Sequence, residues 1–459
     1  MADPFAHSSM LASTTTGTTT STQFHTQNGG YVWTFTGFGF SGGAIPTGGT
    51  ITGISFSGGG TVTGISYSVA ALRNAAEPGP MLAAIFAGND TINGGAFSDA
   101  LTGYGGTNVL NGGDGDDLLQ TLGVADTLDG GDGIDQLYIE RTSSAGVTLN
   151  LAGMETATGI TLSDGTIVRN VERFYVTTGA GNDVLTFSGT LSSSNMFNAG
   201  AGIDRVVIDI SGTSESWSQQ YDRIVNQFGN GAIFSSVEEF YITTGSGSDS
   251  LQGGTRNDRL IAGGGDDVIH GGGGIDYIDG GDGEDALYID RGATTAAIAL
   301  NTGDMASSAG VTFADGTVIR NIERYEFLSG SGADVFNITA NPTASAFGQS
   351  RIDGGGGNDT LNLNLPDLTT SLYLFWYNIE TVHATTGSGA DTLYGGSGND
   401  ELRAGGGDDI LYGGSGGVDL LDGGDGADTA EVNLSDVTSP ISVTFADVDT
   451  ASGVTFATG

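Results

Sequence analysis

Residues 245–289 decide the fold, because they repeat one nine-residue pattern: GSGSDSLQG, GTRNDRLIA, GGGDDVIHG, GGGIDYIDG and GDGEDALYI. The repeated aspartates are Asp249, Asp258, Asp267, Asp276 and Asp285, and a Leu or Ile stands two places after each. A flexible linker does not keep an aliphatic residue in fixed phase with glycine and aspartate. In the frame G-G-x-G-x-D-x-U-x, we expect the first six residues to form a turn and the last three a short strand whose aliphatic residue U points inward.

Two further arrays keep this frame. The upstream array carries Asp or Asn every nine residues, at Asp90, Asp99, Asn108, Asp117, Asp126 and Asp135. The downstream array carries Asp391, Asp400, Asp409, Asp419 and Asp428, with one inserted residue before Asp419. Single turns are expected at Asp183, Asp204, Asp334 and Asp359. The chain is therefore organised by repeats, and its fold is expected to follow from stacking them.

A longer repeat contains the arrays. GGDGIDQLYIER from Gly130 returns as GGDGEDALYIDR from Gly280, and DGTIVRNVERF from Asp164 returns as DGTVIRNIERY from Asp315. The segments between the arrays are rich in Thr, Val, Ile, Phe and Tyr and are predicted to be strands that cap each array. GVTFATG at 453–459 matches GVTFADG at 310–316, so the natural protein is expected to continue.

We therefore predict an all-β chain with seven parts. They are a Ser/Thr- and Gly-rich N-terminal region with a small β unit at 1–80, repeat arrays at 81–139, 245–290 and 387–430, β-rich spacers at 140–244 and 291–386, and the truncated start of a further spacer at 431–459.

The turn residues form a ligand set suited to calcium. Glycine allows φ above zero and lets backbone carbonyls approach a common point, and aspartate adds a carboxylate beside them. Ca²⁺ takes about six to eight oxygen ligands, whereas Mg²⁺ demands octahedral geometry and Zn²⁺ prefers Cys and His. The candidate aspartate ligands are Asp99, Asp117, Asp135, Asp249, Asp258, Asp267, Asp276, Asp285, Asp359, Asp391, Asp400, Asp409, Asp419 and Asp428. The candidate turn glycines are Gly113, Gly115, Gly131, Gly133, Gly263, Gly265, Gly272, Gly274, Gly281, Gly283, Gly355, Gly357, Gly396, Gly398, Gly405, Gly407, Gly424 and Gly426.

Two nonapeptides are expected to make one coil, so that successive turns lie on opposite edges and each ion lies between turns eighteen residues apart. We expect roughly six to ten bound Ca²⁺ ions. Asn108 replaces a charge with a neutral oxygen, and Phe97, Leu122, Val124 and Arg256 stand where the turn needs glycine, which weakens the sites there. The expected pairs are Asp99 with Asp117, Asp117 with Asp135, Asp249 with Asp267, Asp258 with Asp276, Asp267 with Asp285, Asp391 with Asp409, Asp400 with Asp419, and Asp409 with Asp428.

Composition narrows the functional classes. The 459 residues include 54 Asp and Glu against 13 basic residues, all of them Arg, for a net charge of −41. We do not expect nucleic acid as a partner, because a protein binds it through basic groups that neutralise the phosphates. There is no Cys, so disulfides cannot cross-link the chain, and we expect bound metal ions to do so instead. The first 23 residues carry no basic residue or apolar run typical of a signal peptide, and no stretch reaches the ~18–20 apolar residues of a membrane span.

These arrays resemble the repeats-in-toxin (RTX, haemolysin-type) calcium-binding repeat family. The nonapeptide match is specific and covers about a third of the chain. The resemblance implies right-handed parallel β-roll segments, extracellular or cell-surface location, and type I export from a Gram-negative bacterium. In that route the chain crosses unfolded at low calcium and folds in millimolar external calcium.

The leading functional hypothesis is a non-enzymatic cell-surface structural protein, such as a surface-layer, adhesin or matrix component, with self-association or cell-surface polysaccharide as partners. The alternative is the repeat region of a larger secreted enzyme or toxin. No HExxH motif occurs, and the two G-x-S-x-G matches, at 39–43 and 413–417, lack a strand-to-helix context. A glycan-binding platform would use exposed aromatics, but we expect core packing for Trp33, Trp217, Trp376, Phe174, Tyr175, Phe240, Tyr241 and Tyr325.

Overall fold

The computed structural model describes residues 88–433, apart from gaps at 143, 190–194, 221–222, 227–230, 303–304, 341–348 and 373, and strands at 9–14, 22–28, 31–41, 48–56, 61–68 and 455–457. Contacts divide the chain into two units: unit 1 comprises 1–209 with 222–237, and unit 2 comprises 210–221 with 238–459. Strands are the regular elements of the described residues, which contain no helix. The all-β prediction is confirmed.

The strands have these bounds. Unit 1 contains β1 (Ser9–Thr14), β2 (Thr22–Asn28), β3 (Tyr31–Ser41), β4 (Gly48–Phe56), β5 (Thr61–Ser68), β6 (Thr91–Asn93), β7 (Ala100–Gly103), β8 (Val109–Asp114), β9 (Leu118–Thr121), β10 (Thr127–Asp132), β11 (Gln136–Arg141), β12 (Thr148–Asn150), β13 (Ile160–Thr161), β14 (Ile167–Arg169), β15 (Arg173–Thr178), β16 (Val184–Ser188), β17 (Asn195–Asn198), β18 (Arg205–Asp209), β20 (Arg223–Asn226) and β21 (Gly231–Ser235). Unit 2 contains β19 (Trp217–Gln220), β22 (Glu239–Thr243), β23 (Ser250–Gln252), β24 (Arg259–Ile261), β25 (Val268–His270), β26 (Tyr277–Asp279), β27 (Ala286–Asp290), β28 (Ala299–Asn301), β29 (Val311–Thr312), β30 (Val318–Arg320), β31 (Arg324–Leu328), β32 (Val335–Ile338), β33 (Ser350–Asp353), β34 (Thr360–Asn364), β35 (Leu374–Tyr377), β36 (Thr381–Thr385), β37 (Thr392–Tyr394), β38 (Glu401–Arg403), β39 (Ile410–Ser415), β40 (Val418–Asp422), β41 (Thr429–Asn433) and β42 (Thr455–Ala457).

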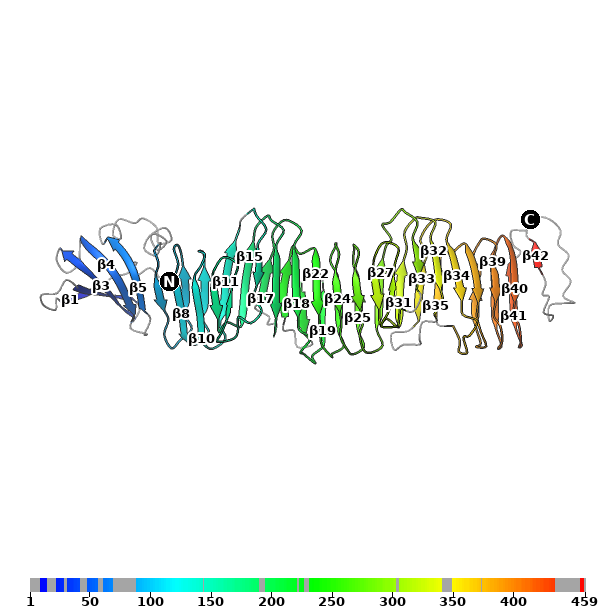
Figure 1. The fold of residues 1–459 in the computed structure, drawn as a ribbon, viewed down its shortest axis with the longest axis horizontal. Helices are drawn as coiled ribbons and strands as arrows, with labels where there is room; N and C mark the ends of the chain where they lie inside the picture. The colour runs from blue at the N-terminus through cyan, green and yellow to red at the C-terminus, as the bar shows by residue number, and fades with distance from the viewer. Residues whose placement is uncertain are drawn as a thin grey trace. The chain divides into compact units, whose positions relative to one another are not determined.

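Successive nonapeptides place their strands alternately in two sheets (Figure 1). In unit 2, β23, β25 and β27 form one parallel ladder, in which Leu251 aligns with Ile269 and Ile269 with Leu287. The intervening β24 and β26 form a second ladder, in which Leu260 aligns with Ile278. All five aliphatic residues are buried. Because side chains alternate along a strand, the residue at position U of each repeat enters the core, which is the parallel β-roll predicted from the sequence.

The spacers continue the roll in one sheet and close it in another. In unit 1, β11 of the first array pairs in parallel with β15 of the following spacer, from Gln136 opposite Arg173 to Arg141 opposite Thr178. On the other side, the antiparallel hairpin β13–β14 follows β10 and ends that sheet. Unit 2 repeats this arrangement, since β27 continues into β31 while the hairpin β29–β30 follows β26. For the first and central arrays, the expectation that spacer strands cap the array is therefore right for one sheet and wrong for the other.

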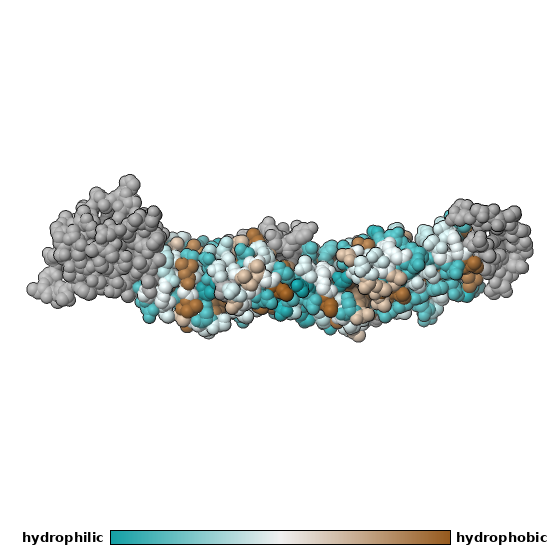
Figure 2. Space-filling model, turned by 90° about the horizontal axis from the view of Figure 1, so that it is seen from above, coloured by the Kyte–Doolittle hydropathy of each residue, from teal (hydrophilic) through white to brown (hydrophobic). Residues whose placement is uncertain are grey.

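Other strands complete each unit. In unit 1, β1 to β5 pair antiparallel in chain order, and β5 pairs with β6. In unit 2, the sheets β28-β32-β34-β36-β38-β40-β42 and β37-β39-β41 carry the third array. Figure 2 shows a largely hydrophilic or neutral surface with scattered apolar residues. Much of residues 431–459, including 434–454, lies outside the described residues.

Most of the named aromatic residues pack as the core interpretation predicts. Phe174, Trp217, Phe240 and Tyr325 are buried, and the ring of Tyr175 stacks on Tyr138 with centroids 4.8 Å apart. Trp376 is partly buried, and the side chain of Trp33 lies outside the described residues. Phe174, Trp217, Phe240 and Tyr325 are therefore not available to a glycan platform.

Candidate calcium-binding turns

Most of the predicted turn glycines, which stand at the second and fourth positions of the repeat, have a left-handed backbone. In the central array φ is +93° at Gly263, +111° at Gly265, +104° at Gly281 and +146° at Gly283. A side chain is strained in this region, so the turn depends on glycine here. The same holds for the predicted residues Gly113, Gly115, Gly131, Gly133, Gly272, Gly274, Gly355, Gly357, Gly405, Gly407, Gly424 and Gly426.

Gly396 and Gly398 differ from the other predicted turn glycines, because neither has a positive φ. The N–H of Gly398 donates to the carbonyl of Glu380 at 2.6 Å, so one side of this turn packs against the spacer, while on the other side the N–H of Ser415 donates to the Gly396 carbonyl at 2.9 Å. Their sequence predicts the same turn as elsewhere, and packing on Glu380 overrides it.

Turns eighteen residues apart are stacked directly on one another. A Cβ atom on Gly281 would overlap the carbonyl oxygen of Gly263, and one on Gly283 would overlap that of Gly265. The N–H of Asp282 donates to the Gly263 carbonyl at 2.9 Å, and the N–H of Gly265 donates to the Asp282 carbonyl at 2.8 Å. Close backbone stacking is a second reason why only glycine fits these positions.

The aspartates of stacked turns form a ladder along each edge. The N–H of Asp249 donates to Oδ1 of Asp267 at 2.6 Å, and the N–H of Asp267 donates to Oδ1 of Asp285 at 2.9 Å. Every pair expected from the sequence is joined in this way, which places each on adjacent coils. Single turns follow the same rule: the N–H of Asp334 donates to Oδ1 of Asp359 at 2.7 Å.

In one class of turn, the ladder uses one oxygen of the carboxylate and leaves the other buried without a donor. Oδ2 of Asp117, Asp135, Asp267, Asp285 and Asp409 is buried without a hydrogen-bond partner. Asp359 in the second spacer shares this feature. A buried carboxylate oxygen with no donor is costly unless a cation or a proton satisfies it.

The residues fit a hard cation. Nowhere in the described part of the chain do three or more His, Asp or Glu side chains converge as a metal cluster. An ion between two turns would therefore take carboxylate oxygens such as those of Asp267 and Asp285 and complete its shell with turn carbonyls and water. An all-oxygen shell with few charges is characteristic of Ca²⁺ and unlike a Zn²⁺ site.

A second class of turn satisfies Oδ2 internally. Oδ2 of Asp258 accepts the N–H of Gly254 at 2.8 Å, and Oδ2 of Asp99 accepts the N–H of Gly95 at 2.7 Å. Asp400 does the same with Gly396 at 2.9 Å. None of these three turns has left-handed glycines at the second and fourth positions. The weakness expected at the turns with Phe97 and Arg256 thus has a structural counterpart.

Burial raises the pKa of many ladder aspartates. Desolvation raises the pKa of Asp267 to about 9, that of Asp258 to about 8 and that of Asp285 to about 7. Neighbouring carboxylates add to the rise, while hydrogen bonds from backbone N–H groups oppose it. In unit 1 burial raises the pKa of Asp135 to about 6. The charged form of each group therefore needs a cation to be stable in this setting.

Three glutamates extend the ladder, and the sequence interpretation missed them. The N–H of Asp135 donates to Oε2 of Glu172 at 2.8 Å, and the N–H of Asp285 donates to Oε2 of Glu323 at 2.8 Å. Asp359 and Glu380 are joined likewise at 2.7 Å.

The available signal for these glutamates was the recurring Asn-Val/Ile-Glu triplet. Its asparagines, Asn170, Asn321 and Asn378, all have a left-handed backbone, with φ of +50°, +53° and +50°. In each coil the asparagine supplies the left-handed residue and the glutamate supplies the carboxylate, so the triplet replaces a nonapeptide turn.

A comparison with protein families agrees with this geometry. The profile of the RTX calcium-binding nonapeptide repeat matches residues 86–119, 123–138, 243–278, 268–296, 347–365 and 385–417. The chain therefore carries RTX calcium-binding nonapeptide repeats. The matched segments contain most of the stacked turns described above, although Asp334, Asp419 and Asp428 lie outside them, and RTX repeats bind calcium. A search of curated proteins finds no match to the RTX chain.

Proposed function

We propose that this RTX chain is a secreted protein that folds, and then assembles, when it meets extracellular Ca²⁺, and that it serves as a non-enzymatic structural component of a cell surface, such as a surface layer, adhesin or matrix. The observation that carries the proposal is the column of buried Oδ2 atoms without donors, as at Asp267 and Asp285. With a net charge of −41, the chain repels itself unless cations bind. Roughly six to ten Ca²⁺ ions between stacked turns would add about +12 to +20 and so relieve much of this repulsion.

The proposed route to the surface is type I export from a Gram-negative bacterium. Folding coupled to calcium suits a chain that must cross membranes unfolded, because the turns lack their cation until they reach the outside. In the described residues no helix is long and apolar enough to cross a bilayer.

The structural role is favoured over the alternative, a repeat region of a larger secreted enzyme or toxin. The G-x-S-x-G match at 413–417 covers the end of β39 and the turn into β40, whereas a nucleophilic serine of this motif sits between a strand and a helix. Stacked turns with buried ligands account for most of the acidic motifs without assigning any of them to catalysis.

Self-association or a cell-surface polysaccharide is the proposed partner. One aromatic row supports the polysaccharide: the rings of Tyr394 and Tyr412 stack at 4.8 Å, and Trp376 meets Tyr394 edge-on at 6.4 Å. Tyr394 is 41% exposed. Sugar rings pack on exposed aromatic faces, so loss of polysaccharide retention on Tyr394→Ala, with folding unchanged, is the expected result of an affinity assay.

The test of the proposed function is far-UV circular dichroism with thermal melting, in millimolar Ca²⁺, in excess chelator and in Mg²⁺. We expect β signal and a cooperative transition with Ca²⁺ alone, and light scattering on the same samples to rise with Ca²⁺. Spectra and melting unchanged by chelator would show that the aliphatic ladders fold without the ion. Calcium-dependent folding without a rise in scattering would contradict the assembly part alone.

A further inference from the structure

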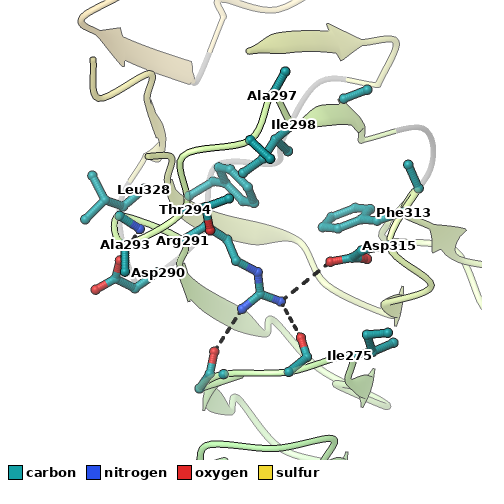
Figure 3. Close-up of a pocket in the computed structure, with 18 residues that line it drawn as sticks. Ile275, Asp290, Arg291, Ala293, Thr294, Ala297, Ile298, Phe313, Asp315 and Leu328 are labelled. Carbon is teal, nitrogen blue, oxygen red and sulfur yellow. Dashed lines mark hydrogen bonds and ion pairs between the residues drawn. The ribbon is translucent and has the colours of Figure 1, made fainter. Parts of the chain in front are cut away.

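Arg291 lies against the last glycine turn on its edge of the central array. Its Nη1 donates to the carbonyl of Gly272 at 2.9 Å, and its Nη2 donates to the carbonyl of Gly274 at 3.0 Å. Nη2 also lies 3.9 Å from Oδ2 of Asp276 and 3.9 Å from Oδ2 of Asp315. The side chain is only 13% exposed. Figure 3 shows the guanidinium between the turn carbonyls and Asp315.

The groups that hold Arg291 are the ligand set of a calcium turn. Gly272 and Gly274 occupy the second and fourth positions of the repeat, with φ of +74° and +105°. Asp276 occupies the sixth. No nonapeptide turn follows on this edge, because the hairpin β29–β30 takes the next place after β26, and Asp315 comes from that hairpin's turn. Arg291 therefore fills the interval where the next ion of the column would lie.

The equivalent residue in unit 1 behaves differently. Arg141 stands at the place of Arg291 in the longer repeat, and its Nε and Nη2 both donate to Oδ2 of Asp164, at 3.0 and 2.8 Å. The turn there has Leu122 and Val124 where unit 2 has its two glycines. The arginine of this repeat therefore donates to the carbonyls of the nonapeptide turn in unit 2, where the turn has glycines, and to Asp164 in unit 1, where it does not.

We propose that the carbonyls of Gly272 and Gly274 with the carboxylates of Asp276 and Asp315 form a further cation site, and that the guanidinium of Arg291 is its built-in occupant in place of Ca²⁺. The planar guanidinium donates to two acceptors at once and is always charged, which suits it to a site that must stay filled. The end of this edge is then stabilised without calcium, whereas the turns before it need a bound ion. This inference rests on calcium binding by the neighbouring turns.

The surroundings of Arg291 leave room for an ion once the side chain is shortened. The arginine lies on the wall of a cavity of about 940 Å³, whose other walls include Ala293, Ala297, Phe313 and Leu328. Because this cavity is open to solvent, truncation of Arg291 would expose the four oxygens to water and Ca²⁺ without breaking the sheet hydrogen bonds beside them.

Native mass spectrometry of the full chain counts bound ions one by one and tests this directly. At saturating Ca²⁺, Arg291→Ala is expected to bind one ion more than the unaltered chain. Arg291→Ala combined with Asp315→Asn should lose that gain, and the matched variant Arg141→Ala should show none. An Arg291→Ala ion count equal to or below that of the unaltered chain, in protein that is folded by circular dichroism, would overturn the proposal.

Hydrogen exchange at residues 272–276 gives an independent measure, and Arg291→Gln serves if the alanine variant does not fold. In the unaltered chain, protection at this turn should outlast that at 263–267 when calcium is removed. In the variant, protection at both turns should depend on calcium. Equal calcium dependence of the two turns in the unaltered chain would contradict the built-in occupant. An unaltered chain that binds no calcium would overturn the proposed function and this inference together.

Discussion

The first and central arrays carry almost the same repeat, yet they present different oxygens. GGDGIDQLYIER from Gly130 and GGDGEDALYIDR from Gly280 differ at few positions, but the turns before them differ at two glycines. In unit 1, where Leu122 and Val124 stand, Oδ2 of Asp126 accepts the hydroxyl of Thr121 at 2.5 Å. In unit 2 the carbonyls of the corresponding glycines, Gly272 and Gly274, accept hydrogen bonds from the guanidinium of Arg291. Aspartate alone therefore does not define a calcium turn.

The same distinction recurs between neighbouring turns of one array. Asp267 follows two left-handed glycines, and its Oδ2 has no donor, whereas Asp258 follows Arg256, and its Oδ2 accepts the N–H of Gly254. In these two neighbouring turns, left-handed glycine at the fourth position accompanies a carboxylate oxygen that has no backbone donor. The comparison predicts that the two classes of turn respond differently to metal, pH and substitution.

The largest effect is expected from pH in the calcium-free chain. The pKa of Asp267 is raised to about 9 in the fold, so the stability linked to its protonated form is fully present below its ordinary pKa and is lost as pH rises through about 9. In unit 1 the pKa of Asp135 is raised only to about 6, so the corresponding loss ends near that pH. Between about pH 6 and 9 the central array should lose further stability through Asp267, whereas Asp135 contributes no further loss in the first array.

Hydrogen exchange at residues 263–289 and 109–139 in metal-stripped protein checks this difference. In saturating Ca²⁺ the stability should instead rise with pH, because protons then compete with the ion for the same oxygens. Equal loss of protection in both arrays over the upper pH range would contradict the distinction.

The next largest effect is expected from Asp267→Asn. The substitution keeps an acceptor for the N–H of Asp249 but places an amide nitrogen where the ion needs Oδ2. In Ca²⁺ we expect destabilisation on the order of 3 kcal/mol, the usual cost of removing one partner of a buried charge pair. In chelator the variant should be more stable than the unaltered chain, because an unpaired buried carboxylate has been removed.

The matched control for Asp267→Asn is Asp258→Asn, whose Oδ2 already has a donor at Gly254. Calcium titrations followed by circular dichroism should show a smaller shift for the control. Similar shifts for the two variants would mean that the internal hydrogen bond does not distinguish the turns.

Much of the fold was predictable because it depends on local periodicity. The nine-residue phase of Leu251, Leu260 and Ile269 predicts short strands, buried aliphatics and turns eighteen residues apart, and each of these is found. The spacers were harder because their coils have no fixed length. The N–H of Asp183 bonds Asp204 across 21 residues, whereas that of Asp334 bonds Asp359 across 25.

The parts of the site that the sequence interpretation missed depend on contacts between distant residues. Glu323 joins the ladder across 38 residues, and Arg291 approaches the Gly272 carbonyl across 19. No spacing rule of the nonapeptide brings them there. They follow from where the spacer hairpin leaves the stack, which only the folded backbone defines.

A moderate effect is expected from Gly281→Ala. Its φ of +104° is strained for any side chain, and the new Cβ would overlap the carbonyl of Gly263. Strain of this kind costs roughly 1–3 kcal/mol, with or without calcium. Gly264→Ala is the matched control, because its φ is not positive and the nearest atom to its new Cβ is 3.6 Å away. Equal melting temperatures for the two variants would contradict the role given to left-handed glycine.

The smallest change in stability, and the sharpest test of the comparison, is expected from Arg256→Gly. The Arg256 side chain is exposed, so its loss should change stability in chelator by no more than about 0.5–1 kcal/mol, mainly through added backbone freedom. Glycine at this fourth position lets the turn adopt the left-handed backbone and releases Oδ2 of Asp258 from Gly254. The variant should therefore bind calcium more tightly at this edge. Thr255→Gly adds the same freedom one position away from where the turn needs it, so its calcium titration should match that of the unaltered chain. If both glycine variants bind alike, the position of the glycine is irrelevant and the class of a turn must be decided by the spacer packed beneath it, as it is at Gly398 on Glu380.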